Sequence, residues 1–316
     1  MSDQTKASLP RIGITVGDLN GIGPEVIIKS LDHDRFINRC IPIIYGSAQT
    51  LIYHKKLLKN KNFNFHQISG AEQAQEGKIN VINAWKDDVR IAIGEASPAT
   101  GKAALQAIQK ACADAKEGLI DAIVTGPIHK KTVQQAGLDF PGHTEYLANF
   151  FEAENHLMLL VGENIKIATV TGHIPLEKVS QEVSKKKVLK AIKCLNQSLD
   201  QDFQIKGGKI AVLGLNPHAG EEGQLGDDEA ESILPAIEEA NRNRIHAYGP
   251  YPADGFFGSQ MYREFDAVLS IYHDQGLIPF KLMEFDKGVN YTAGLPIIRT
   301  SPDHGTAYDI AGKGVV

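Results

Sequence analysis

Short apolar segments alternate with amphipathic ones along this chain, and the alternation predicts an α/β fold with a largely parallel sheet. Several of the apolar runs are followed directly by Gly, Pro, His or Asp. Such polar groups are typical of ligand sites, because open α/β sheets bind ligands at the carboxyl ends of their strands. The 316 residues suffice for about two domains, and no repeat, low-complexity tract or Pro/Ser-rich linker divides them.

The composition is that of an ordinary soluble protein, with 42% hydrophobic residues and a net charge of -5 from 33 basic and 38 acidic residues. No basic face or run suits a nucleic-acid backbone, so we expect no nucleic-acid partner. Cys40, Cys112 and Cys194 are predicted to be reduced core thiols of a cytoplasmic protein. The first residues lack the pattern of a signal peptide, and no run approaches the length of a membrane span.

The first predicted strand, residues 11–16, leads into a glycine-rich loop and a helix that begins at Pro24. The loop resembles a dinucleotide-binding fingerprint but departs from it, because Val26 stands where a third Gly or Ala is wanted. No acidic residue ends the next strand, residues 41–45, either. A Rossmann site is therefore disfavoured, while Asp18 and Asn20 remain available to a ligand or to the backbone.

The other predicted elements follow the same alternation. Helical periodicity marks 100–116, and a strand at 120–124 follows it. The later predicted strands are 157–161, 165–170, 210–215 and 267–271, the first two of them a possible hairpin, and the later helices are 188–195, 230–240 and 277–283.

A further helix begins near Gly142 in the run FPGHTEYLANFF. His143 and Thr144 would then lie at its N-terminus, where backbone N–H groups and the helix dipole favour an anion. Alternatively, Thr144 only caps the helix.

Three histidines occupy equivalent local positions, since His173, His218 and His273 each come just after an apolar strand. If the strands are neighbours, the three imidazoles converge on one divalent ion and leave positions open for substrate. Neutral imidazoles suit Zn, Co, Ni and Mn. Each histidine taken singly also fits a hydrogen-bonded loop residue.

The C-terminal stretch gathers Lys281, Asn290 and Arg299 with Asp303 and His304 among glycines and prolines. Together with the predicted N-terminus of the helix at Gly142, these cations and the amide would suit a small substrate bearing a phosphate or carboxylate. The alternative is that Lys281 and Arg299 are surface charges.

Taken together, these segments resemble the 4-hydroxythreonine-4-phosphate dehydrogenase family of the pyridoxal phosphate pathway. The resemblance runs nearly from end to end, through RIGITVGDLNGIGPEVI, DAIVTGPIHKKTVQQAG, FPGHTEYLA, ATVTGHIPL, LGLNPHAGEEGQLGDDE, GPYPADGFF, YHDQGLIPFK and GVNYTAGLPIIRTSPDHGTAYDIAG. The first loop departs from the family, which commonly has Pro-Ala where this chain has Leu19-Asn20.

The resemblance implies a fold like that of isocitrate and isopropylmalate dehydrogenases, with two α/β/α domains and a cleft between them. Its domains would be residues 1–127 plus 285–316, and residues 128–284. It implies a homodimer that shares its active sites, and oxidation of 4-phosphohydroxy-L-threonine by NAD or NADP to a 3-oxo acid that loses CO2. No membrane partner is expected.

The resemblance also assigns residues to roles. A divalent metal (Zn, Mg, Co or Mn) would be bound by His173, His218 and His273. The phosphorylated substrate would be bound by His143, Thr144, Lys281, Asn290 and Arg299. The general base stays open between Lys281 and Asp254.

Three other functions are compatible with these segments. Relatives of the family act on phosphorylated threonate or erythronate, which carry a hydroxyl in place of the amine. A non-catalytic phospho-ligand sensor would have lost metal or substrate residues, and all eight assigned positions are intact. A metal-dependent phosphatase would release phosphate without any change in nicotinamide absorbance.

Overall fold

The computed structural model describes residues 8–32, 34–140 and 142–316. They form two compact units: unit 1 is Met1–Glu152 with Ile297–Val316, and unit 2 is Ala153–Pro296. The chain passes between the units after residues 152 and 296. The resemblance implied boundaries after residues 127 and 284, which are earlier in the chain. Residues 128–152 remain with unit 1, where helix α5 (Lys130–Gln135) packs on helix α4 (Pro98–Lys116). Residues 285–296 remain with unit 2, where strand β11 (Val289–Ala293) pairs with strand β6 (Leu157–Val161).

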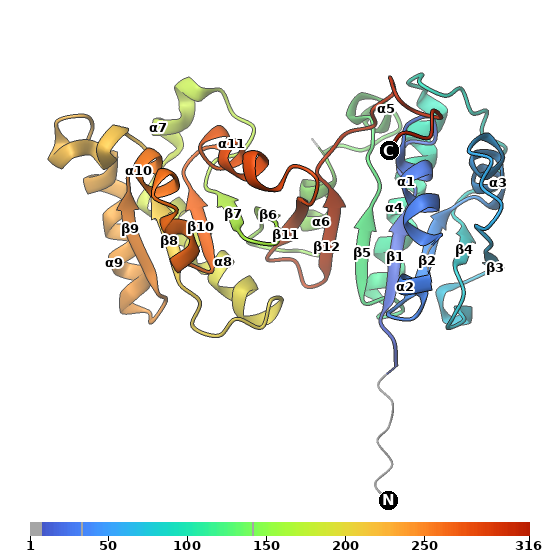
Figure 1. Ribbon diagram of the computed structural model, residues 1–316, viewed down its shortest axis with the longest axis horizontal. Helices are drawn as coiled ribbons and strands as arrows, with labels where there is room; N and C mark the ends of the chain where they lie inside the picture. Colours follow the sequence, from blue (N-terminus) through green and yellow to red (C-terminus); the bar gives the residue numbers. More distant parts are fainter. Residues whose placement is uncertain (1–7, 33, 141) are drawn as a thin grey trace, which may run out of the picture. The chain divides into compact units, whose positions relative to one another are not determined.

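Unit 1 is a parallel sheet in the strand order β3-β4-β2-β1-β5-β12 with helices around it (Figure 1). Besides α4 and α5, its elements are β1 (Arg11–Thr15), α1 (Gly23–Leu31), α2 (Asp34–Ile37), β2 (Ile41–Gly46), α3 (Ala48–Leu57), β3 (His66–Ile68), η1 (Ala71–Gln73), β4 (Asn80–Asn83), β5 (Ala122–Thr125), α6 (His143–Phe150) and β12 (Ile298–Pro302).

Helix α4 is the main helix packed on this sheet, and it contacts β1, β2 and β5. Ser97 caps it, with its Oγ accepting from the N–H of Ala99 at 3.3 Å. Its apolar stripe, which includes Ala104, Ile108 and Ala111, is buried as its periodicity predicts. A Cβ at Gly101 would lie 2.5 Å from the backbone of Thr132, so this glycine is what allows α5 to approach.

Unit 2 is a mixed sheet in the strand order β11-β6-β7-β10-β8-β9. Its remaining elements are β7 (Lys166–Thr169), η2 (Leu176–Lys178), α7 (Val179–Glu182), α8 (Lys185–Gln201), β8 (Ile210–Leu213), η3 (Pro217–Gly223), η4 (Glu229–Ile233), α9 (Leu234–Arg242), β9 (Ala247–Tyr251), α10 (Ala253–Gly258), η5 (Met261–Glu264), β10 (Ala267–Ser270) and α11 (His273–Glu284). β6 is antiparallel to β7, which confirms the predicted hairpin, and β7, β10, β8 and β9 run parallel.

Alternate strand residues of unit 2 enter two hydrophobic clusters, one on each face of the sheet. Leu269 packs with residues of α8 and α9, whereas its neighbour Val268 packs with Phe280 of α11 and Phe256 of α10. The helices on the two faces can be followed in Figure 1. Burial on both faces explains why these strands read as apolar runs rather than as alternating patterns. The α/β prediction with a largely parallel sheet is confirmed.

The structure also contains elements that the sequence did not predict. No strand was predicted for the residues of β11 and β12, because the polar Asn290 and Arg299 interrupt their apolar residues. α11 begins at His273 rather than at residue 277, and Pro279 lies inside it. The helix predicted at 230–240 is divided between η4 and α9.

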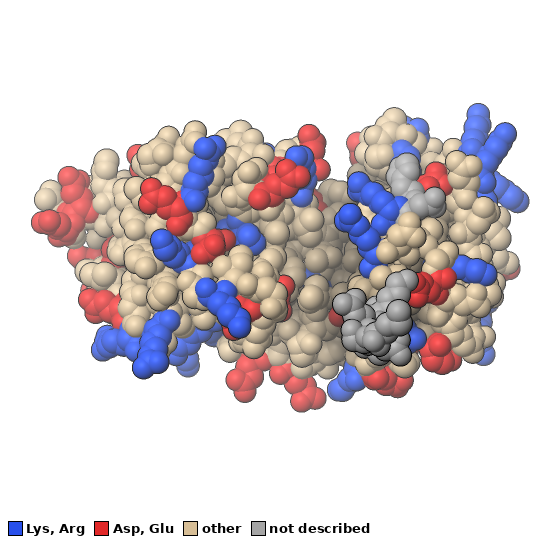
Figure 2. Space-filling model, turned by 60° about the horizontal axis from the view of Figure 1, so that its bottom comes forward, with Lys and Arg blue, Asp and Glu red and all other residues tan. Residues whose placement is uncertain are grey.

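The cysteines are free, as predicted, although Cys40 is only half-buried while Cys112 and Cys194 are buried. On the face shown in Figure 2, basic and acidic side chains are interspersed, in keeping with the mixed charge of the sequence. Among the helices of the described residues, none is both long and apolar enough to span a membrane.

Candidate active site

Arg299 is the centre of a buried polar cluster in unit 1. β12 pairs in parallel with β5, which sets Arg299 opposite Ile123, and its side chain is only 3% exposed. The guanidinium donates from Nη2 to Thr125 Oγ1 at 2.6 Å and from Nη1 to Thr144 Oγ1 at 3.4 Å. Arg299 is therefore not a surface charge, and a buried guanidinium of this kind is suited to a carboxylate or phosphate.

The N-terminus of α6 forms the second part of this cluster. Gly142 is the N-cap and offers no side-chain cap, so Thr144 lies inside the helix and its hydroxyl contacts Arg299 instead. The alternative that Thr144 only caps the helix is wrong. The first N–H groups of α6 lack intrahelical partners, and they favour an anion at this point.

The charge state of the cluster is set by burial. Burial, with Arg299 and Lys130 nearby, lowers the pKa of His143 to about 3. Burial also lowers the pKa of Arg299 to about 10, against the opposing effect of Glu145. At neutral pH the cluster thus presents one guanidinium, a neutral imidazole and hydroxyl groups, a combination that attracts an anion.

In unit 2 the three histidines follow neighbouring strands. His173 comes after β7, His273 after β10 and His218 after β8, and β10 pairs in parallel with both of the others. All three therefore lie at the carboxyl edge of this sheet, as the sequence predicted.

Only two of these histidines come together. The rings of His173 and His273 have centroids 5.4 Å apart, and both line a hollow of about 370 Å³ with Tyr272 and Asp274. His218 is exposed on η3 and does not line this hollow. Within residues 8–32, 34–140 and 142–316, no group of three His, Cys, Asp or Glu side chains is close enough to bind a metal.

Asp274 is a site residue that the sequence reasoning did not assign. Its Oδ1 lies 2.6 Å from His273 Nδ1. Because a carboxylate only accepts, Nδ1 carries the proton and Nε2 keeps the lone pair that a metal needs. The signal was present, since Asp274 directly follows His273 in the run YHDQG.

The two neighbouring imidazoles and the carboxylate-fixed tautomer fit a divalent ion as part of a ligand set. One chain supplies two of the three predicted imidazoles at this place. A third ligand would have to come from elsewhere.

The remaining predicted residues of unit 2 are distributed over three elements. Lys281 is half-buried on α11, with its Nζ 5.9 Å from the centroid of the Phe285 ring. Asn290 is on β11 opposite Leu160, and its buried Oδ1 has no hydrogen-bond partner among the described residues. Asp254 is exposed in the first turn of α10, a helix that contacts the η3 segment carrying His218.

The loop after β1 is structural. Asn20 is buried, its Nδ2 donates to Glu95 O at 2.6 Å, and its Oδ1 accepts from the N–H of Ala92 at 2.9 Å. Asp18 Oδ2 accepts from the hydroxyl of Tyr308 at 2.8 Å. Both side chains are thus used by the protein itself, which resolves the alternative that the sequence left open.

The glycines of this loop serve packing as well. A Cβ at Gly21 would lie 2.7 Å from Thr306 O, and one at Gly23 would lie 2.4 Å from Val16 O. Their resemblance to a dinucleotide fingerprint therefore reflects close backbone approach within unit 1.

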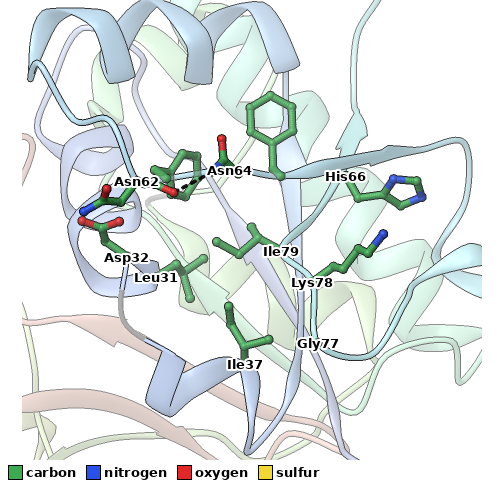
Figure 3. Close-up of a pocket in the computed structure, with 11 residues that line it drawn as sticks. Leu31, Asp32, Ile37, Asn62, Asn64, His66, Gly77, Lys78 and Ile79 are labelled. Atoms are coloured by element: carbon green, nitrogen blue, oxygen red, sulfur yellow. Dashed lines mark hydrogen bonds between the residues drawn. The ribbon is translucent and has the colours of Figure 1, made fainter.

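A hollow of about 420 Å³ in unit 1 is not lined by any predicted site residue. Polar Asp32, Asn62 and Lys78 surround apolar Leu31 and Ile79 there (Figure 3). It lies beside the first residue of β3 and the residue preceding β4, which is the amino edge of the sheet. Parallel sheets bind ligands at the opposite edge, so this hollow is not part of the candidate site.

In an α/β protein, a buried cluster around an arginine and a pair of imidazoles at the strand ends are typical of enzymes that act on small anionic substrates. The profile of the family described as pyridoxal phosphate biosynthetic protein PdxA matches residues 38–316. The chain belongs to this family, which confirms the resemblance seen in the sequence.

The individual relatives agree with this assignment. A curated protein of Bacteroides thetaiotaomicron, named 4-hydroxythreonine-4-phosphate dehydrogenase, is 47% identical over 306 residues, or 96% of this chain and 84% of the relative. An Oceanobacillus iheyensis protein with the provisional name D-threonate 4-phosphate dehydrogenase is 42% identical, with 97% of this chain and 93% of the relative covered. A crystal structure of the Klebsiella pneumoniae 4-hydroxythreonine-4-phosphate dehydrogenase matches with a TM-score of 0.87 and 36% identity, covering 99% of this chain and 95% of that one.

Proposed function

We propose that this protein oxidises the hydroxyl of 4-phosphohydroxy-L-threonine with NAD or NADP, in a reaction that depends on a divalent metal. The product is a 3-oxo acid that loses CO2 to give 3-amino-2-oxopropyl phosphate, in pyridoxal 5'-phosphate biosynthesis. The observation that carries the proposal is the buried cluster of Arg299, Thr144 and His143, found in a chain of this family. The identity of the substrate is taken from the names of the chain's relatives.

The substrate phosphate is proposed to bind this cluster. Arg299 is already fixed by Thr125, so it can meet a phosphate without a large loss of side-chain entropy. A neutral His143 can donate one N–H to a phosphate oxygen without itself carrying charge. Lys281 and Asn290 are proposed as further substrate residues on the strength of the family resemblance.

The metal site is proposed to be shared between two copies of the chain. His173 and His273 lie together in one copy, and the partner's His218 is proposed as the third ligand. A divalent ion there would be Zn, Mg, Co or Mn, and it would lower the pKa of the substrate hydroxyl and stabilise negative charge on that oxygen. The protein is therefore proposed to be a homodimer, the commonest symmetric assembly.

A side chain of the protein would accept the proton of the substrate hydroxyl. The hydroxyl proton passes to a base as the carbon-bound hydrogen leaves as hydride to the nicotinamide, so the substrate loses two electrons. Lys281 and Asp254 are the candidate bases. Of the two, Lys281 is half-buried on α11 and Asp254 is exposed on α10.

A second substrate is proposed as the alternative, because relatives such as the Oceanobacillus protein carry the D-threonate 4-phosphate name. The same phosphate cluster would serve both substrates, which differ in an amine and a hydroxyl. The cytoplasm, where three unpaired thiols remain reduced, is the proposed location.

The deciding experiment is a spectrophotometric assay for NADH or NADPH with each substrate, with and without a chelator. Formation of reduced nicotinamide with 4-phosphohydroxy-L-threonine, abolished by the chelator and restored by a divalent metal, is the expected result. Preferential turnover of D-threonate 4-phosphate would assign the alternative. Phosphate release without reduced nicotinamide would indicate a phosphatase, and full activity after thorough removal of metal would refute metal dependence.

A further inference from the structure

The segment that carries His218 has an unfavourable backbone. His218, Ala219 and Glu221 have φ values of 52°, 52° and 44°, in the left-handed region that residues with a Cβ rarely adopt. Each such residue costs roughly 1–2 kcal/mol. A run of them persists only where the surroundings hold it, so the groups that hold this segment also determine where His218 lies.

Glu229 is one of the groups that hold the segment carrying His218, through the residues that precede it. This carboxylate is buried, and its Oε1 accepts from the N–H groups of Leu215 at 2.7 Å and Asn216 at 2.8 Å. Its Oε2 accepts from Asn216 Nδ2 at 2.9 Å. A Cβ at Gly220 would lie 2.7 Å from Oε2, so the chain closes directly over the carboxylate.

Gln275 holds the segment from the neighbouring strand. Its Oε1 accepts from the N–H of Ile271 at 2.7 Å, at the end of β10, and its Nε2 donates to Gly214 O at 2.6 Å, just after β8. The side chain thus bridges the ends of two adjacent strands. Gln275 lies two residues after His273, and its partner Gly214 lies four residues before His218. The bond to Gly214 O joins α11 to the chain that follows β8.

We infer that Gln275 is a positioning residue, which fixes the His218 segment relative to His273 so that both imidazoles are presented to metal at the right places. The inference rests on the proposed metal-dependent function. The two histidines could bind one ion, or each could bind the ion of a different site. Both arrangements require a constant distance between His218 and His273 along the sheet edge, so the inference applies to both.

Gln275→Glu tests this inference with little change in shape. The carboxylate can still accept from Ile271, but it presents an acceptor to Gly214 O, so the cross-strand bond is lost. Gln197→Glu is the matched control, since Gln197 donates a similar amide bond, at 3.0 Å to Gln201, on the exposed side of α8. Gln275→Met is the second variant if the glutamate form does not fold.

Two measurements on the full chain give the answer. The first is Co²⁺ affinity, followed by the visible absorption of the bound ion, and the second is amide hydrogen exchange of residues 214–224 in metal-free protein. For Gln275→Glu we expect Co²⁺ affinity to fall by roughly 10- to 100-fold, as for other groups that orient metal ligands, with faster exchange in this segment. Gln197→Glu should match the parent in both.

The outcomes separate the inference from the proposed function. Parental Co²⁺ affinity in Gln275→Glu overturns the inference. If the parent itself does not bind Co²⁺, the proposed metal site fails, and hydrogen exchange alone decides the positioning role. Faster exchange at residues 214–224 then supports that role, and parental rates there overturn it.

Discussion

The cluster around Arg299 in unit 1 and the histidine edge of unit 2, the strand ends that carry His173, His218 and His273, are built in opposite ways. Arg299 is buried, and hydroxyl groups of the same unit already accept from it. His273 is 34% exposed, and His218 is more exposed still, on a strained segment. The first arrangement is preorganised within one chain. The second presents its histidine side chains at or near the surface.

The difference follows from the ligands that each region is proposed to bind. A phosphate needs fixed donors in a dry place, and burial strengthens each bond to it. A metal needs imidazoles that keep a free lone pair, and these must stay unbonded on that nitrogen until the ion arrives. Substitutions should therefore affect stability and activity differently in the two regions.

The largest effect is expected at the histidine edge. His173→Ala, His218→Ala and His273→Ala should each lose bound metal and reduce kcat/KM on the order of a thousand-fold, because the charge stabilisation that the ion supplies is lost. Since His173 and His218 are exposed and His273 is partly exposed, the free energy of unfolding should stay within about 0.5 kcal/mol of the parent. Metal analysis and urea unfolding measure the two quantities.

Mixing the inactive chains tests the sharing of the site. A hybrid dimer of His218→Ala and His273→Ala would contain one intact site, so subunit exchange should restore roughly a quarter of the parent activity. A mixture of His173→Ala and His273→Ala is the control, and it should stay inactive because those two residues belong to one chain's half of the site. Recovery in the control, or none in the test mixture despite exchange confirmed by mass spectrometry, would contradict the sharing.

The next effect is expected at Arg299. Arg299→Lys keeps the charge but loses the planar fork that meets Thr125, Thr144 and a phosphate together. We expect kcat/KM for the phosphorylated substrate to fall, with a loss of transition-state stabilisation of about 1.5–3 kcal/mol. The metal content should stay normal. Arg39→Lys, at an exposed position of the same unit, should be neutral. A parental kcat/KM in Arg299→Lys would argue against a substrate role.

A smaller effect on stability is expected in the loop after β1. Asn20→Ala removes two partly buried hydrogen bonds that join a buried side chain to residues 92 and 95, so the free energy of unfolding should fall by about 2 kcal/mol. The KM for NAD or NADP should not change, because the side chain is used by the protein. Asn64→Ala, at an exposed position, is the control for urea unfolding. A raised nucleotide KM with parental stability would show that this loop binds the cofactor after all.

The smallest effect concerns pH. The folded pKa of His143, about 3, lies below the roughly 6.5 of an unfolded histidine. Between these values the unfolded chain binds a proton that the folded chain does not, so stability is complete above about pH 6.5 and decreases as the pH falls. We expect a loss of about 1 kcal/mol by pH 5, since the ring retains some contact with solvent.

His143→Gln should remove this part of the pH dependence, as followed by thermal unfolding between pH 7 and pH 5. An unchanged slope in the variant would mean that His143 is protonated in the folded protein. In that case the cluster would carry two cations rather than one.

The sequence by itself determined the α/β alternation, the strand-end position of the three histidines and the family. These properties are local: an apolar run followed by His, or a motif such as YHDQG, is read from neighbouring residues. The failed fingerprint at Val26 disfavoured a Rossmann loop, and in the structure Gly21 and Gly23 of that loop approach the backbone of unit 1 closely. Strands that carry polar residues, such as β11 and β12, escaped prediction because their burial depends on neighbours distant in sequence.

Only the tertiary structure decided which of these residues meet. It joined Arg299 to Thr125 and Thr144, which lie more than 150 residues earlier in the chain, and it separated His218 from the pair His173 and His273. It also showed that Gln275 bridges two strand ends, a contact that no local pattern signals. The physical reason is that strand order within a sheet is set by the packing of whole elements, and sequence spacing carries no record of that order.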